Sequence, residues 1–182
     1  MVFIINGYLG SGKDTFVEMV ATQWKRMQEK QNFIFKREVV NISTIDYLKD
    51  IFKEQFNWSG EKTKEVRVAL ATVHQALCHW NDIPFVLTSE KIKQEHLKDN
   101  IVFVHCREPE NIFKYSCAFN APTIFIKNDK AKQIVMNFPD KFSFADKNVE
   151  NYKYNIYINN NGSFEDLEEE ANKFIMDQII GI

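Results

Sequence analysis

The residues with the clearest chemical meaning stand near the N-terminus, where a glycine-rich segment ends in a lysine. The segment reads Gly7-Tyr8-Leu9-Gly10-Ser11-Gly12-Lys13-Asp14-Thr15. Glycines let successive backbone N–H groups turn inward around phosphate oxygens, and a helix that starts there directs its positive end at the same anion. The lysine would add a mobile cation for the outer phosphates. The spacing therefore predicts a P-loop for a nucleoside triphosphate, here ATP.

The position after the lysine departs from the strict motif, which has Ser or Thr there. Asp14 stands at this position and Thr15 follows it, so we expect Thr15, or Asp14 through a water molecule, to help hold Mg²⁺. The residues expected to bind the nucleotide are Gly7, Leu9, Gly10, Ser11, Gly12, Lys13, Asp14 and Thr15. An ordinary strand-to-helix turn is the alternative. The apolar run before the loop and the helical pattern after it favour the P-loop.

Arginine is scarce in this chain, which narrows the search for side chains that grip a phosphate in a bidentate way. The four arginines are Arg26, Arg37, Arg67 and Arg107. Arg107 follows an expected central strand at its C-terminal end, where open α/β sheets bind ligands, so we assign it to a substrate phosphate. An ion pair with Glu110 is the alternative. Arg67 could hold the phosphate of the acceptor, but a solvated helix face explains it equally well.

Short apolar runs alternate with helical patterns along the chain. Strands are expected at residues 2–5, 38–42, 101–106, 123–126 and 154–158. Helices are expected from residue 13, over 45–56, 61–80 and 84–98, after Arg107, and from Ser163, while residues 127–151 look polar and irregular. Ser43 to Asp46 has the form of a capping box, and Ser163 should cap the last helix. This alternation predicts an α/β protein with a three-layer P-loop NTPase fold, whose five-stranded parallel sheet is flanked by helices.

Composition limits the classes of function. The 182 residues fit one domain, and a net charge of −2 provides no strong attraction to nucleic acid or to an anionic membrane. No apolar run reaches the roughly 18 residues of a membrane span, and no signal-like segment opens the chain. The chain has three cysteines, Cys78, Cys106 and Cys117. An odd number cannot all pair within one chain, and their spacing is not that of a metal site. We therefore expect a cytoplasmic protein with free thiols, and we expect His74 and His79 to be core or surface residues rather than metal ligands.

At these motifs the chain resembles a known family. Gly-Ser-Gly-Lys-Asp-Thr at 10–15 resembles the P-loop of the phage-type deoxynucleoside monophosphate kinases, within the nucleoside monophosphate kinase group. The strand that ends in Arg107-Glu108-Pro109-Glu110 is similar to one where that family tends to place Asp-x-Arg and a nearby Glu. Residues 154–167 resemble the closing strand, Asn, Gly and helix of such kinases. Residues 46–53 stand where those enzymes begin their acceptor-binding helices.

The resemblance implies transfer of a phosphoryl group from ATP, with Mg²⁺, to a nucleoside or deoxynucleoside monophosphate. For this reaction we expect catalytic roles for Lys13, Arg107 and Arg67, from their places in the loop, after the central strand and on the long middle helix. Residues 1–182 would form a single kinase domain, with a helical acceptor-binding region at about 44–98 and a lid-like segment at about 127–151. A homodimer is possible, and no nucleic acid or membrane partner is expected.

Two departures from the family pattern keep alternatives open. His105 stands where the family has an acidic residue, and residues 127–141 carry four lysines but no arginine. Lysine neutralises charge but cannot form the bidentate fork of arginine. The alternatives are therefore a P-loop kinase of another small phosphorylated metabolite and a nucleotide-binding protein that has lost catalysis.

Overall fold

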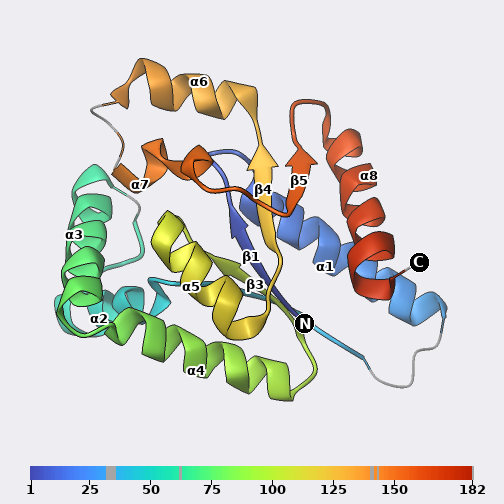
Figure 1. Ribbon diagram of the computed structural model, residues 1–182, viewed down its shortest axis with the longest axis horizontal. Helices are drawn as coiled ribbons and strands as arrows, with labels where there is room; N and C mark the ends of the chain where they lie inside the picture. The colour runs from blue at the N-terminus through green and yellow to red at the C-terminus, as the bar shows by residue number, and fades with distance from the viewer. Residues whose placement is uncertain (32–35, 62, 140–141, 143, 182) are drawn as a thin grey trace.

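Five parallel strands form the centre of the computed structural model, which describes residues 1–31, 36–61, 63–139, 142 and 144–181 (Figure 1). They are β1 (Val2–Asn6), β2 (Val39–Ser43), β3 (Ile101–His105), β4 (Thr123–Lys127) and β5 (Ile156–Asn159). Their order in the sheet is β2-β3-β1-β4-β5. The carboxyl end of β1 therefore lies between those of β3 and β4, and the segments that follow these strands share one edge of the sheet.

Helices cover both faces of the sheet, which gives three layers. The longer helices are α1 (Lys13–Lys30), α2 (Asp46–Phe56), α3 (Lys64–Trp80), α4 (Ile83–Leu97), α5 (Pro109–Phe119), α6 (Asp129–Asn137) and α8 (Phe164–Phe174). Shorter turns are α7 (Phe144–Lys147), the 3₁₀ turn η2 (Val149–Asn151) and the π-helical turn η3 (Ile175–Ile180). Helices α1 and α8 pack on one face, and α4 and α5 pack on the other (Figure 1). In the described part of the chain, no helix is long and apolar enough to cross a membrane.

Alternate residues of β1 supply both cores. Phe3 and Ile5 point to the side of α1 and α8, whereas Val2 and Ile4 point to the opposite side. This burial on both faces explains why the strand reads as a continuous apolar run. All five strands were expected from such runs, and the α/β fold with a parallel sheet is confirmed.

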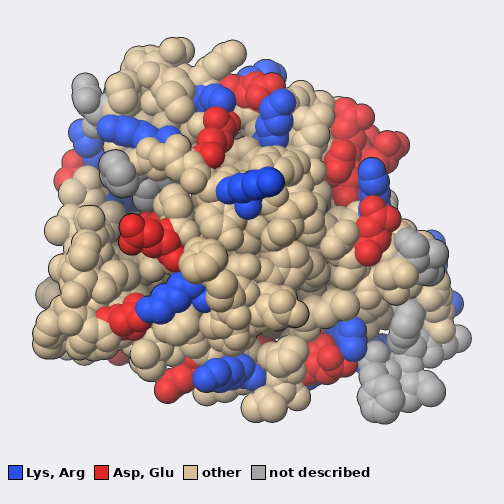
Figure 2. Space-filling view, viewed as in Figure 1, with Lys and Arg blue, Asp and Glu red and all other residues tan. Residues whose placement is uncertain are grey.

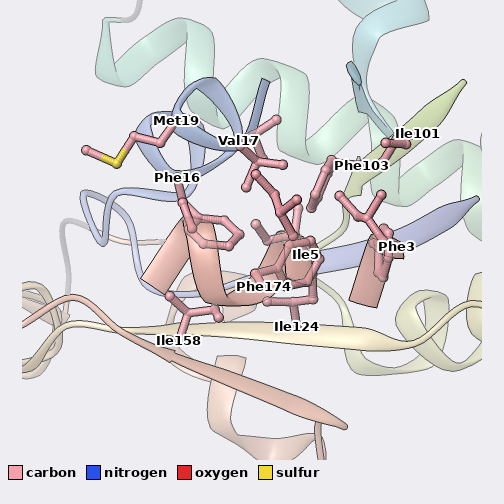
Figure 3. Close-up of a cluster of buried hydrophobic side chains, with 14 of the residues drawn as sticks. Phe3, Ile5, Phe16, Val17, Met19, Ile101, Phe103, Ile124, Ile158 and Phe174 are labelled. Atoms are coloured by element: carbon pink, nitrogen blue, oxygen red, sulfur yellow. The ribbon is translucent and has the colours of Figure 1, made fainter. Parts of the chain in front are cut away.

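Aromatic rings hold α1 and α8 against the sheet (Figure 3). The rings of Phe3 and Phe103 stack with their centroids 5.3 Å apart, and Phe16 meets Phe174 edge-on at 5.5 Å. Offset and edge-on pairs of this kind stabilise a core beyond the area that they bury. Because Phe16 lies one helical turn after Lys13, this cluster fixes the start of α1, where the P-loop ends.

One of the two predicted helix caps is confirmed and the other is wrong. The Ser163 hydroxyl accepts from the Asp166 N–H at 3.2 Å, and the Asp166 carboxylate accepts from the Ser163 N–H, which completes a capping box. Ser43 instead ends β2, and α2 begins after Ile45 without a side-chain cap. Of the two hydrogen bonds of a capping box, only the one from the Ser43 N–H to the Asp46 carboxylate forms here, at 2.8 Å. The Ser43 hydroxyl does not cap the helix, because the strand holds Ser43 in the sheet.

The prediction that residues 127–151 are irregular is wrong for 129–137, which form α6. The Asn128 side chain caps this helix by accepting from the Ala131 N–H at 2.9 Å. Ala131 and Val135, four residues apart, are its buried side chains, while Ile134 and Met136 are exposed. Only two positions on this helix are buried, and the consecutive apolar residues at 134–136 do not show the spacing of three or four that indicates a helix.

We predict that Phe16→Ala lowers the free energy of unfolding by about 3–5 kcal/mol, because the truncation leaves a cavity in the aromatic cluster. Urea denaturation would measure the loss. Phe113→Ala is the matched control, since that ring is 62% exposed and its removal should change stability by less than about 1 kcal/mol. Equal losses from the two substitutions would contradict the role of the cluster.

Candidate functional site

The glycine-rich segment joins the buried end of β1 directly to the first turn of α1. Its backbone turns back on itself, because the Ser11 N–H donates to the Tyr8 carbonyl at 3.0 Å. Tyr8 and Ser11 are buried, so they form the floor of the loop. The helix that follows has 18 residues and starts at Lys13, so the positive end of its dipole lies at the loop.

Gly12 has a backbone conformation and a neighbour that both exclude a side chain. Its φ of 89° is left-handed, and a Cβ at this position would collide with the amide of Asn160. That amide donates to the Ser11 carbonyl at 2.8 Å. The turn between β5 and α8 therefore closes over the P-loop. The Asn-Gly turn is visible in the sequence, but a role for Asn160 is not, because only the fold brings the two segments together.

Lys13 points back into the loop. Its Nζ donates to the Gly7 carbonyl at 2.7 Å and to the Tyr8 carbonyl at 2.9 Å. Burial lowers the pKa of Lys13 to about 8, and the nearby Arg107 charge acts in the same direction, although Asp14 opposes it. A phosphate would restore the preference of this side chain for its charged form.

Arg107 has an ion partner that the sequence did not indicate. Its Nη1 lies 2.9 Å from Oδ1 of Asp146, a buried residue of α7, whereas Glu110 was the partner weighed from the sequence. The two residues are 39 positions apart, and Asp146 stands in a stretch without a clear motif. The pair ties the end of β3 to the segment expected to act as a lid.

The buried Asn6 amide links the same elements. Its Nδ2 donates to the Arg107 carbonyl at 3.2 Å and to the Tyr154 hydroxyl at 2.8 Å. That hydroxyl in turn donates to the Val149 carbonyl at 2.6 Å. These bonds hold the end of β1, the end of β3 and η2 in a fixed relation, because an unpaired buried polar group is costly.

His105 lies at the end of β3 and faces the first turn of α1. Its Nε2 is 3.7 Å from Oδ1 of Asp14. Burial lowers the pKa of His105 to about 4; Asp14 opposes this shift, and the charges of Lys13 and Arg107 add to it. The imidazole is therefore neutral at physiological pH.

The structure brings Lys13, Asp14 and Arg107 together. The charges of Asp14 and Arg107 are both close enough to shift the pKa of the Lys13 ammonium. Thr15 lies beside them in the first turn of α1. Arg67 lies in the first turn of α3, where it is exposed, and its role in holding an acceptor stays a prediction. The predicted residues thus divide between the P-loop edge and a separate helix.

The carboxylate of Asp14 and the hydroxyl of Thr15 offer oxygen donors that fit a divalent cation. Among the described residues, no group of three or more His, Cys, Asp or Glu could hold a metal ion by itself. A cation at this edge would therefore need further ligands from the nucleotide phosphates and from water, as Mg²⁺ commonly does.

His74 is a core residue, as one of the two sequence interpretations expected. It is 4% exposed, and its Nδ1 lies 3.3 Å from the Tyr47 hydroxyl of α2. Its Nε2 contacts the Cys78 sulfur at 3.7 Å. The histidine joins α2 to α3 and so fixes the arrangement of the helices between β2 and β3.

A surface hollow beside α8 is less suited to phosphate than the P-loop is. Asp166, Glu169 and Glu170 line it together with Lys173. On the face seen in Figure 2, acidic side chains also gather over α8, while elsewhere the described Lys and Arg side chains are interspersed with Asp and Glu. These carboxylates would repel a polyphosphate, so the P-loop is the better candidate for an anion.

Comparison with solved structures agrees with the three-layer α/β fold described above. A shikimate kinase from Bacteroides thetaiotaomicron is 12% identical, with a TM-score of 0.50 over 100% of this chain and 99% of that chain. The chain has the P-loop NTPase fold. A thymidylate kinase from Ehrlichia chaffeensis is 15% identical, with a TM-score of 0.47 over 96% of this chain and 98% of that one. No protein-family model matches the chain, and no curated protein matches it.

We predict that Gly12→Ala weakens ATP binding at least tenfold, because the added Cβ must displace Asn160 and the left-handed backbone becomes strained. Isothermal titration calorimetry would measure the dissociation constant. Gly60→Ala is the matched control, since its φ of 97° is also left-handed but a Cβ there meets open space. Unchanged ATP affinity in Gly12→Ala would show that the nucleotide binds elsewhere.

We also predict that the affinity for ATP falls as the pH rises above about 8. The charged form of Lys13 binds phosphate, and the free protein loses this proton near its lowered pKa of about 8. A bound phosphate would raise the pKa, so the dissociation constant should increase about tenfold per pH unit between 8.5 and roughly 10. Titrations at several pH values test this, and a flat profile would contradict the role of Lys13.

Proposed function

We propose that the protein transfers the terminal phosphoryl group of ATP to a nucleoside or deoxynucleoside monophosphate, giving ADP and the diphosphate. The observation that carries this proposal is the P-loop at the head of α1, with the half-buried Lys13 ammonium held against loop carbonyls. A lysine charge that is largely removed from water has a strong preference for an anion.

In this reaction the ATP phosphates would lie along residues 7–15. Lys13 would exchange the Gly7 and Tyr8 carbonyls for oxygens of the outer phosphates. An oxygen of the acceptor phosphate attacks the terminal phosphorus, and the bond between that phosphorus and the ADP oxygen breaks. The protein contributes positioning and charge neutralisation, which are the main requirements of phosphoryl transfer.

Arg107 is proposed to hold a substrate phosphate. Its present partner is the Asp146 carboxylate, and a phosphate would compete for the same guanidinium. Arginine favours such oxyanions because its planar fork donates two parallel hydrogen bonds. Binding of the acceptor would therefore loosen the tie between β3 and α7.

Asp14 and Thr15 are proposed to hold the divalent cation with the phosphates of ATP. When bound, the cation neutralises charge on the phosphate oxygens. Arg67, in the helical region at 44–98, is proposed to approach the acceptor, and the lid is proposed to comprise 127–151. Lys132 of this lid pairs with Glu150 at 2.7 Å, so the lid carries lysine charges in place of arginine.

Residues 10–15 and the segment 107–110 resemble the corresponding segments of the phage-type deoxynucleoside monophosphate kinases. This resemblance supports a nucleotide acceptor over another metabolite. A kinase of a different phosphorylated metabolite would share the P-loop, because the acceptor pocket lies elsewhere in the fold. A catalytically silent binding protein is the other alternative, and two features favour it: His105 at the end of β3 and the absence of arginine from residues 127–151.

A coupled assay of ADP release tests the proposal with ATP, a divalent cation and a panel of ribo- and deoxynucleoside monophosphates. We expect turnover with one or a few of them, reduced at least about 100-fold in Lys13→Ala, because one cation at the transferring phosphate is worth several kcal/mol. Lys30→Ala, at the far end of α1, is the matched control and should keep full activity. Tight ATP binding without turnover on any acceptor would favour the alternatives.

A further inference from the structure

His105 occupies a position in the site that none of the roles above uses. Its side chain is 14% exposed, and its Nε2 atom is buried without a hydrogen-bond partner among the residues that the structure describes. This nitrogen faces the Asp14 carboxylate across 3.7 Å. Asp14 is already the candidate ligand of the divalent cation that accompanies ATP.

We propose that His105 Nε2 and the Asp14 carboxylate together ligate this cation, and that the site selects Mn²⁺ or a similar transition-metal ion over Mg²⁺. The inference rests on the proposed function, because the cation is the one that enters with ATP. It assigns His105 as a ligand and so changes the donor set from oxygen only to nitrogen and oxygen.

The distance between the two donors agrees with a shared ion. Imidazole nitrogen and carboxylate oxygen each lie about 2.1 Å from a bound dication, so two such donors can be at most about 4.2 Å apart. The observed separation of 3.7 Å is within this limit. The Asp14 side chain is 74% exposed, so it can adjust its position without disturbing the core.

The type of donor determines the preferred ion. Mg²⁺ selects oxygen ligands in nearly ideal octahedral geometry, whereas imidazole suits first-row transition metals. A buried imidazole nitrogen at the end of a central strand is therefore a poor ligand for Mg²⁺ and a more suitable one for a transition-metal ion such as Mn²⁺. A carboxylate at the same position would reverse this preference.

The charges around His105 predict when the cation binds. Four charged groups act on the imidazole; three of them, Lys13, Arg107 and Lys49, are cations, and Asp14 is the anion. Arg107 is paired with Asp146 and Lys49 with Asp46, so the site has little net negative charge with which to attract a free dication. The phosphates of ATP supply the missing negative charge, so we expect Mn²⁺ to bind as its complex with ATP and only weakly by itself.

Electron spin-echo envelope modulation of Mn²⁺·ATP bound to the protein tests the assignment. The full chain is prepared with ordinary histidine and with ¹⁵N-labelled histidine, so that nitrogen of the nucleotide does not interfere. We expect a directly coupled nitrogen whose frequencies change with the label. This comparison uses the unaltered protein and therefore does not depend on whether a variant folds.

Two variants accompany the spectra. His105→Asp should abolish the histidine coupling and shift the ratio of the dissociation constants for Mn²⁺·ATP and Mg²⁺·ATP about tenfold towards Mg²⁺. His96→Gln removes an exposed histidine of α4 and should leave both results unchanged.

Bound Mn²⁺·ATP without a label-dependent nitrogen coupling would overturn the assignment of His105 and leave the proposed function intact. A spectrum identical to that of Mn²⁺·ATP in solution would show that the nucleotide does not bind, which would overturn both. A coupling that survives in His105→Asp would assign the ligand to another histidine.

Discussion

Two positive charges held partly out of water at the ends of β1 and β3 determine how the rest of the site is arranged. Lys13 turns towards the Gly7 and Tyr8 carbonyls, and Arg107 pairs with Asp146. Each interaction provides an oxygen partner where a phosphate could provide a better one. The loop, the contact of α7 with Arg107 and the neutral His105 can all be understood as responses to this local concentration of charge.

The fold keeps these charges close together. Because β1 lies between β3 and β4, the P-loop and the Arg107 segment leave the same edge of the sheet. The Asn6 amide bonds to the Arg107 carbonyl and to Tyr154, and the aromatic cluster around Phe16 anchors the first turns of α1. These contacts hold the backbone at Arg107 and the start of α1 in a fixed relation, and such preorganisation is what an anion site requires.

The sequence predicted the features whose causes are local. Apolar runs marked the strands, the glycine spacing marked the P-loop, and Ser163 marked the last helix, because each depends on a few neighbouring residues. Contacts between distant segments were not predictable: Asp146 reaches Arg107 across 39 positions, and Asn160 reaches Ser11 across 149. Helix α6 was missed because its buried face is only Ala131 and Val135.

The imidazole at position 105 is consistent with the balance of charge in the site. Around Lys13 the charged partners are Arg107, Asp14 and Asp146, so two cations face two carboxylates. A third carboxylate at the end of β3 would give the empty site a net negative charge and would weaken its attraction for a polyphosphate. Because His105 is neutral, the two carboxylates of the site are Asp14 in α1 and Asp146 in α7, and the end of β3 carries none. The site can then attract ATP while it keeps a nitrogen donor for the cation, so charge balance and metal preference have the same structural origin.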